Sequence, residues 1–219
     1  MCILSIIRTD EKFALTHNRD EDVGRVTSPT LISKVINNQP ATFPVDIQSQ
    51  GTWILTSPTW STAILNGGFE LHQRKPPYKH SRGLFPYMLL AFESALDYVE
   101  SLDLNQIEPF TQIMYNHKTK ELHRLVWDDI EKHLFEIHDD TFVISSSTLY
   151  NEDEKKMHKS AIKALNSISS DELADLHKSL SWPHNPKIPM LKTTSQVQIV
   201  ENNENKSMKF TKFVNDKTY

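Results

Sequence analysis

Cysteine is almost absent from this chain, since Cys2 is the only one among 219 residues. A single cysteine excludes an intrachain disulfide framework and any zinc site built on cysteine pairs. Ten histidines are present, but none of them form an H-x-x-x-H pattern. The sequence also contains no G-x-G-x-x-G, P-loop or G-x-S-x-G motif. We therefore expect neither a metal nor a cofactor.

The chain also has no excess of positive charge and no long apolar run. The formal net charge is −4, which leaves no basic footprint for nucleic acid. No apolar run approaches the roughly 18 residues of a membrane span, and the first residues do not follow the signal-peptide pattern. We expect a cytoplasmic protein that acts on a small molecule, and a homo-oligomer is left open. The length suits one domain, or at most two small ones, and we predict a single domain over residues 1–219.

The residue that stands out is Cys2, directly behind Met1. Removal of the methionine would put a thiol and a free α-amine on one residue. Such an amine has a pKa of roughly 7.7–8.0, against about 10.4 for lysine, and so accepts a proton near neutral pH. A nucleophile and its base would then share one residue. The alternative is that a lone cysteine is a small buried hydrophobe.

A hairpin is predicted next to this cysteine. Residues 2–8 are β-branched and apolar on both faces, as in a buried central strand, and residues 13–17 resume a strand pattern. The polar residues between them favour a turn. A loop of two or four residues pairs positions whose numbers sum to 21, which sets Cys2 opposite Arg19 at about 5 Å between Cβ atoms. A three-residue loop would bring Asn18 or Asp20 there instead. The guanidinium would favour the thiolate, and a carboxylate would hold the terminal amine; the alternative is a solvated surface ion pair.

The motifs along the chain resemble those of the NRDE proteins, also called the transport-and-Golgi-organisation 2 family. Five segments carry the resemblance, in order: Met1-Cys2-Ile3-Leu4 with Asn18-Arg19-Asp20-Glu21, Gly51-Thr52-Trp53-Ile54, Ala63-Ile64-Leu65-Asn66, Ser81-Arg82-Gly83, and Ile144-Ser145-Ser146-Ser147-Thr148-Leu149. The family is grouped with the N-terminal nucleophile hydrolases, nearest the choloylglycine hydrolase and penicillin acylase branch. The resemblance implies an α+β fold, an αββα sandwich of two antiparallel sheets between helical layers.

The resemblance and the residues together give a set of candidate site residues. The predicted catalytic residues are Cys2, Arg19, Asp20 and Asn66, and the predicted substrate-binding residues are Asn18, Arg82 and Ser146. Asn66 ends a strand before two glycines and is the candidate oxyanion donor, although Asn-Gly is also a common turn. Arg82 could bind a substrate carboxylate or fix its loop to the sheet. Two positions depart from many relatives, since Ser146 replaces an asparagine and Thr194 an arginine.

Three functions are compatible with these residues. The first is a cysteine hydrolase, an amidase or acylase that cleaves non-peptide C–N amide bonds through Cys2. The second keeps the fold without the chemistry, as a protein that binds lipid, acyl-CoA or a haem-like ligand. The third and weaker one is a class II glutaminase, which shares the Met-Cys start but here lacks a synthase domain.

Periodicity and turn residues predict the remaining elements. Strands are expected at 53–56, 62–65, 110–115, 121–127, 132–137, 142–145, 197–200 and 208–214. Helices are expected at 83–101, 151–168 and 170–180, the last with Ser170 as its N-cap. We predict a turn at 202–205 and a mobile surface loop at 73–79. The order of strands, helix, strands, helices and strands indicates an α+β fold.

Overall fold

The computed structural model describes the chain except for residues 1, 166–168, 182–189, 204 and 214–219. Its contacts divide the chain into two compact units. The first unit contains both ends of the chain, residues 1–26 and 139–219, and the second contains residues 27–138. We describe each unit by itself, and the single domain over 1–219 stays a prediction.

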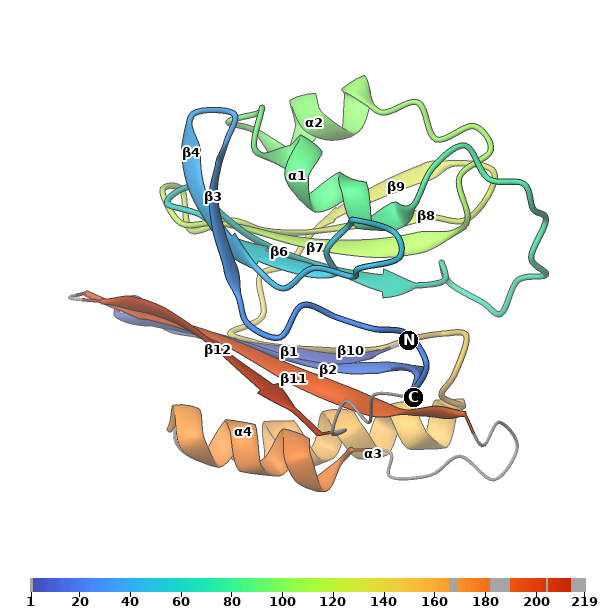
Figure 1. The fold of residues 1–219 in the computed structure, drawn as a ribbon. Coiled ribbons are helices and arrows are strands. Elements are labelled where there is room, and N and C mark those ends of the chain that lie inside the picture. Colours follow the sequence, from blue (N-terminus) through green and yellow to red (C-terminus); the bar gives the residue numbers. More distant parts are fainter. Residues whose placement is uncertain (1, 166–168, 182–189, 204, 214–219) are drawn as a thin grey trace. The chain divides into compact units, whose positions relative to one another are not determined.

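The first unit contains a five-stranded antiparallel sheet in the order β10-β1-β2-β11-β12. The strands are β1 (Cys2–Arg8), β2 (Lys12–Asp22), β10 (Thr141–Ser145), β11 (Leu191–Asn202) and β12 (Lys206–Lys212). Two helices, α3 (Glu152–Lys163) and α4 (Ser170–Ser179), cover one face of this sheet (Figure 1). Strand β1 lies between β10 and β2, which explains why its residues are apolar on both faces.

The hairpin has the first of the two registers that the sequence left open, with Cys2 opposite Arg19. Thr9 and Lys12 close a two-residue loop, because the Thr9 amide donates to the Lys12 carbonyl over 2.8 Å. Every pair along β1 and β2 then sums to 21, and Cys2 lies opposite Arg19. Strand β2 is longer than expected, so residues 18–22 continue the strand.

Polar side chains join α4 to the sheet. Three side-chain amides donate to backbone carbonyls of α4: Asn18 to His177 over 2.6 Å, Gln196 to Ala174 over 3.0 Å, and Gln198 to Ser170 over 2.6 Å. Side chains alternate between the two faces of a strand, so these three residues mark the face of the sheet that α4 covers. Cys2 and Arg19 belong to the opposite face, because Ser5, three residues on from Cys2, bonds His177 of α4.

The caps of the two helices follow simple rules. Helix α3 begins after Asn151 with a capping box, in which Asn151 and Glu154 exchange hydrogen bonds. Helix α4 is capped by Ser169, whose hydroxyl accepts from the Glu172 amide, and not by the predicted Ser170. The cap is one residue earlier because this position puts Glu172 at N3, within reach of the hydroxyl.

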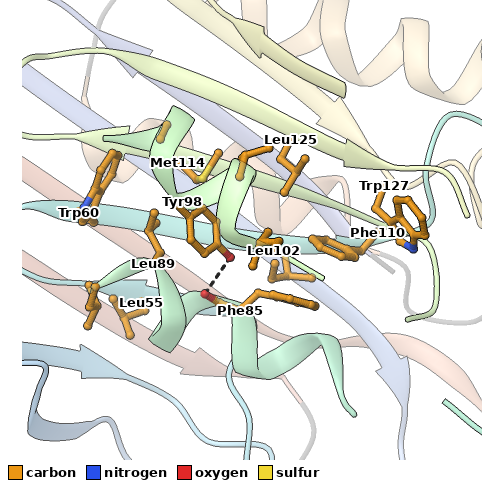
Figure 2. Close-up of a cluster of buried hydrophobic side chains, with 14 of the residues drawn as sticks. Leu55, Trp60, Phe85, Leu89, Tyr98, Leu102, Phe110, Met114, Leu125 and Trp127 are labelled. Carbon is orange, nitrogen blue, oxygen red and sulfur yellow. Dashed lines mark hydrogen bonds between the residues drawn. The ribbon is translucent and has the colours of Figure 1, made fainter. Parts of the chain in front are cut away.

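The second unit is a seven-stranded antiparallel sheet in sequence order, β3 to β9. Its strands are β3 (Ile32–Ile36), β4 (Gln39–Phe43), β5 (Ile54–Thr56), β6 (Trp60–Asn66), β7 (Phe110–Asn116), β8 (Leu122–Trp127) and β9 (Lys132–Glu136). Helices α1 (Phe85–Leu89) and α2 (Ala95–Ser101) pack on one face. Figure 2 shows the cluster between them and the sheet, where the buried Tyr98 hydroxyl donates to the Phe85 carbonyl over 3.2 Å.

The single helix predicted at 83–101 is wrong. A 3₁₀ turn at Arg82–Leu84 leads into α1, which ends at Leu89, and α2 starts only at Ala95. The break has a local cause, since the Ser94 hydroxyl accepts from the Leu96 and Asp97 amides and so starts a new helix. The sequence shows one continuous helical spacing of apolar residues because both short helices pack against the same core.

Strands β3 and β4 were not predicted. Most of the side chains of β3 are exposed, so the strand shows no apolar alternation. The available signal was Asn37-Asn38, both with positive φ, 48° and 61°, as a two-residue hairpin turn requires.

Most other elements match their predictions within a few residues, but β11 starts at Leu191, six residues before the predicted strand at 197–200, and α3 ends at Lys163, before the predicted end at 168. The fold class is α+β with two antiparallel sheets accompanied by helices. The predicted loop at 73–79 contains no helix or strand, and the turn at 202–205 closes β11 on β12, although residue 204 lies outside the described part. The predicted helix end at 166–168 and the last residue of the predicted strand at 208–214 also lie outside it. Among the described helices, none is long and apolar enough to cross a membrane.

Candidate active site

Four residues from four neighbouring strands or strand ends form a row across the first sheet, here called the Cys2 row: Ser146, Cys2, Arg19 and Ser195. The Ser146 amide donates to the Cys2 carbonyl over 2.9 Å, just beyond the end of β10. Cys2 pairs with Arg19, and Arg19 pairs in turn with Ser195 of β11. Side chains on paired positions share a face, so the thiol, the guanidinium and the Ser195 hydroxyl belong to one face of the sheet.

The thiol of Cys2 is buried, with 3% of the residue exposed. Burial raises the pKa of the Cys2 thiol, and the Asp20 carboxylate raises it further, whereas Arg19 and the Asp20 backbone amide lower it. Arg19 lowers the pKa of the thiol, in the predicted direction, but burial raises that pKa by more. The thiol therefore holds its proton at neutral pH and needs a base in order to attack.

Asp20 is fully buried next to this cysteine. The Tyr150 hydroxyl donates to Oδ2 over 2.6 Å, and the Thr193 hydroxyl donates to Oδ1 over 2.5 Å. Burial raises the pKa of Asp20 to about 6, although both hydrogen bonds act to lower it. The carboxyl is thus mostly ionised at neutral pH and titrates close to it.

Arg19 is buried and forms a loose ion pair, with 3.6 Å from Nη2 to Oε2 of Glu21. Arg25 lies 3.9 Å from the same Glu21 oxygen. Burial raises the pKa of Glu21, but Arg19 and Arg25 help to hold it below the usual range. The Glu21 carboxylate therefore pairs with two guanidinium groups. The three side chains together have a net charge of +1 near the thiol.

Asn18 lies on the helix-covered face of the sheet, and not in the Cys2 row. Its amide donates to the His177 carbonyl, and its oxygen accepts from Gln196 over 3.2 Å. These contacts give it a structural role under α4, while its predicted part in substrate binding stays untested.

Ser146 is buried, and its hydroxyl shares a 3.0 Å hydrogen bond with Thr148. Its backbone amide fixes the first residue of β1, as described above. The structure thus brings Ser146 to Cys2, as the sequence predicted for a residue of one site.

Asn66 and Arg82 belong to the second unit. Asn66 ends β6, and Gly67 after it has a φ of 90°, which favours glycine. The Arg82 guanidinium donates to the Pro109 carbonyl over 3.0 Å and pairs with Glu108 over 3.0 Å. Of the two roles considered for Arg82, these contacts favour the structural one, in which it fixes its loop to the sheet.

Close backbone packing explains why two motif positions of this unit are glycine. The Gly51 and Gly83 backbones lie so close that a Cβ on Gly51 would meet the Gly83 Cα at 2.8 Å. The Thr52 amide donates to the Gly83 carbonyl over 2.9 Å at the same place. The Gly-Thr-Trp and Ser-Arg-Gly motifs are therefore two sides of one backbone contact.

Sequence reasoning missed Tyr150, Thr193 and Ser195. Tyr150 follows the Ser-Ser-Ser-Thr-Leu motif directly, and Thr193 and Ser195 flank the position of the missing arginine, so their places in the motifs were the available signal. Within the described part of the chain, no group of three His, Cys, Asp or Glu side chains could hold a metal ion.

Fold and site together define an α+β protein with a buried cysteine at position 2, which pairs with Arg19, and with the buried carboxylate of Asp20 next to Arg19 in the same strand. The model of the Transport and Golgi organisation 2 family matches residues 1–217, and the chain belongs to that family. A comparison with curated proteins finds no match. Among solved structures, the Anbu (Gly-1) mutant from Hyphomicrobium sp. strain MC1 is similar with a TM-score of 0.45 and 10% identity, over 99% of this chain and 89% of that one.

Proposed function

We propose that this protein is an N-terminal cysteine nucleophile hydrolase that cleaves amide C–N bonds of small molecules in the cytosol. The observation that carries the proposal is the pairing of Cys2 with Arg19, with Asp20 buried beside them. The resemblance to N-terminal nucleophile hydrolases supports the same reading, because in that class the first residue of the processed chain supplies both the nucleophile and its base.

The chemistry follows from the protonation states. After removal of Met1, the Cys2 α-amine takes the thiol proton while Sγ attacks the substrate carbonyl carbon. The new C–S bond forms, the C–N bond breaks, and the leaving nitrogen receives the proton from the ammonium group. Water, deprotonated by the same amine, then hydrolyses the thioester, releases the carboxylic acid and restores the thiol.

The neighbouring residues have distinct parts in this scheme. Ionised Asp20 would accept hydrogen bonds from the amine and hold it beside the sulfur, and Arg19 would stabilise the developing negative charge on sulfur. The family resemblance assigns the oxyanion donor to Asn66.

Two measurements test the proposal. The intact mass should correspond to a chain without Met1, and retention of Met1 would remove the base and overturn the mechanism. Because Cys2 is the only cysteine, a chloroacetamide adduct on the wild type reports on this residue alone. A panel of acyl amides, with glutamine included, should show turnover in the wild type and none in Cys2→Ser.

The burial of the thiol and Thr194 in place of the arginine found in many relatives favour a second candidate, a protein that binds an acyl or lipid ligand without turnover. Thermal-shift screening separates the two. Stabilisation by acyl-CoA or fatty acids that persists in Cys2→Ala, without turnover of any amide, would favour binding over hydrolysis.

A further inference from the structure

A bulge in β11 determines which residue faces the Cys2 row. Thr193 pairs with Asp20 and Ser195 pairs with Arg19, so Thr194 is one extra residue between two consecutive pairs. In a regular strand with Thr193 opposite Asp20, the residue opposite Arg19 would be Thr194. Bulges re-aim side chains in this way and are common beside active sites.

The hydroxyls of the two threonines at the bulge are hydrogen-bonded, whereas that of Ser195 is not, within the described part of the chain. Thr193 donates to the Asp20 carboxylate, and the Thr194 hydroxyl donates to the Arg19 carbonyl over 3.1 Å. Ser195 has only 1% of its surface exposed, and its hydroxyl oxygen finds no hydrogen-bond partner among the described residues. Buried hydroxyls normally have a partner, and an exception in the same row as the candidate nucleophile indicates a place for a ligand group.

Geometry and charge indicate what that group is. Ser195 is two strands away from Cys2, about 10 Å between backbones at the usual strand spacing. A substrate group that accepts a hydrogen bond from Ser195 therefore lies about three to five covalent bonds along the substrate from the carbon that Sγ attacks. Arg19 stands between the two residues, and its cluster with Glu21 and Arg25 keeps one positive charge. A guanidinium next to a hydroxyl donor matches a carboxylate.

We propose that Ser195 is a specificity-determining residue of the Cys2 site, and that it donates a hydrogen bond to a carboxylate of the substrate. The substrate class is then an amide that carries a carboxylate about three to five bonds from the scissile carbonyl, as an N-acyl amino acid does. This inference rests on the proposed function, because it takes Cys2 as the nucleophile.

The test uses alkylation of Cys2 in the full-length protein. The probes are N-chloroacetylglycine and N-chloroacetyl-β-alanine, each paired with the neutral carboxamide of the same length. Sγ displaces chloride to form a thioether, and the thiol proton passes to the buffer. We expect the wild type to react about five to ten times faster with at least one acid than with its amide.

Ser195→Ala should lose most of this preference, whereas Ser195→Thr, which keeps a hydroxyl, should retain part of it. Ser207→Ala is the matched control, an exposed serine on β12 of the same sheet, and should behave as the wild type. Ser195→Ala deletes a buried hydroxyl without a partner, so its melting temperature should not fall. If that variant nevertheless failed to fold, the comparison of Ser195→Thr with the wild type would still show whether the preference depends on this side chain.

The possible failures are distinguishable. If no probe alkylates wild-type Cys2, the nucleophile itself is absent, and both this inference and the proposed function are overturned. If Cys2 reacts but acids have no advantage, or if Ser195→Ala keeps the full advantage, only the role of Ser195 is overturned.

Discussion

At the scale of single residues, the decisive balance is between burial and charge around the thiol. Burial raises the pKa of Cys2, Asp20 raises it as well, and Arg19 lowers it. Asp20→Asn should therefore move the midpoint of the pH profile for Cys2 alkylation by iodoacetamide to lower pH, and Arg19→Ala should move it to higher pH. An unchanged midpoint in both variants would show that neither side chain acts on the sulfur.

The hydrogen bond from Thr193 to Asp20 makes a second prediction at this scale. Thr193→Val keeps the shape but leaves a buried carboxylate oxygen without this donor, so unfolding should become easier by about 1.5–3 kcal/mol near pH 8. The loss should shrink below pH 6, where Asp20 gains a proton. Urea unfolding at the two pH values measures both effects, and an equal loss at both would contradict an ionised acceptor.

The residue scale also separates what the sequence could predict from what it could not. Loop lengths restrict hairpin registers to a few, so the position of Arg19 opposite Cys2 was predictable. The partners of Asp20 come from residues 130 and 173 positions away, and no local pattern reports such distances. The bulge at Thr194 is equally hidden, because one extra residue leaves the strand composition unchanged.

At the scale of elements, the contact between Gly51 and Gly83 fixes the start of β5 to the turn before α1. Gly51→Ala would place a methyl group 2.8 Å from backbone atoms that cannot rotate away. We expect a loss of at least about 1–3 kcal/mol of unfolding free energy. Gly24→Ala is the control, since its new methyl group would meet only the Asp22 side chain at 3.2 Å. Equal stability of the two variants would contradict the tight backbone contact.

The boundaries of an element were predictable where residues near in sequence determine them. The helical spacing from residue 151 indicated α3, and the structure adds the capping box at Asn151 that starts it. The split between α1 and α2 was not predicted, because one apolar stripe serves two helices and only the cap at Ser94 marks the break. Strand β3 was missed for another reason: it pairs with β4, but its exposed side chains show no apolar alternation.

At the scale of the whole molecule, two buried groups act oppositely on stability as the pH falls. Burial lowers the pKa of His177 to about 3, so below its unfolded pKa of about 6.5 the unfolded chain binds the extra proton and stability falls. The pKa of Asp20 is raised to about 6. Between pH 6 and its unfolded value of about 3.9, the folded state binds that proton and stability rises. The two contributions largely cancel between pH 6 and 4.

Removing the carboxyl should expose the contribution of His177. In Asp20→Asn, the free energy of unfolding should fall between pH 6 and 4 more steeply than in the wild type, by up to about 1.4 kcal/mol more per pH unit. Urea titrations at several pH values give the two slopes. Parallel slopes would contradict the raised pKa of Asp20 in the folded protein.

The construction of the first unit from both ends of the chain has a consequence for biosynthesis. Strands β1 and β2 leave the ribosome first, but their neighbours β10 and β11 begin only at Thr141 and Leu191. At 5–20 residues per second, the edge of β2 that pairs with β11 stays unpaired for roughly 8–35 s. Residues 27–138 are complete long before then. The Cys2 row thus receives its last member, Ser195, long after Cys2 and Arg19 have been made, and the nascent β1–β2 hairpin exposes an unpaired strand edge in the meantime, which a chaperone could shield.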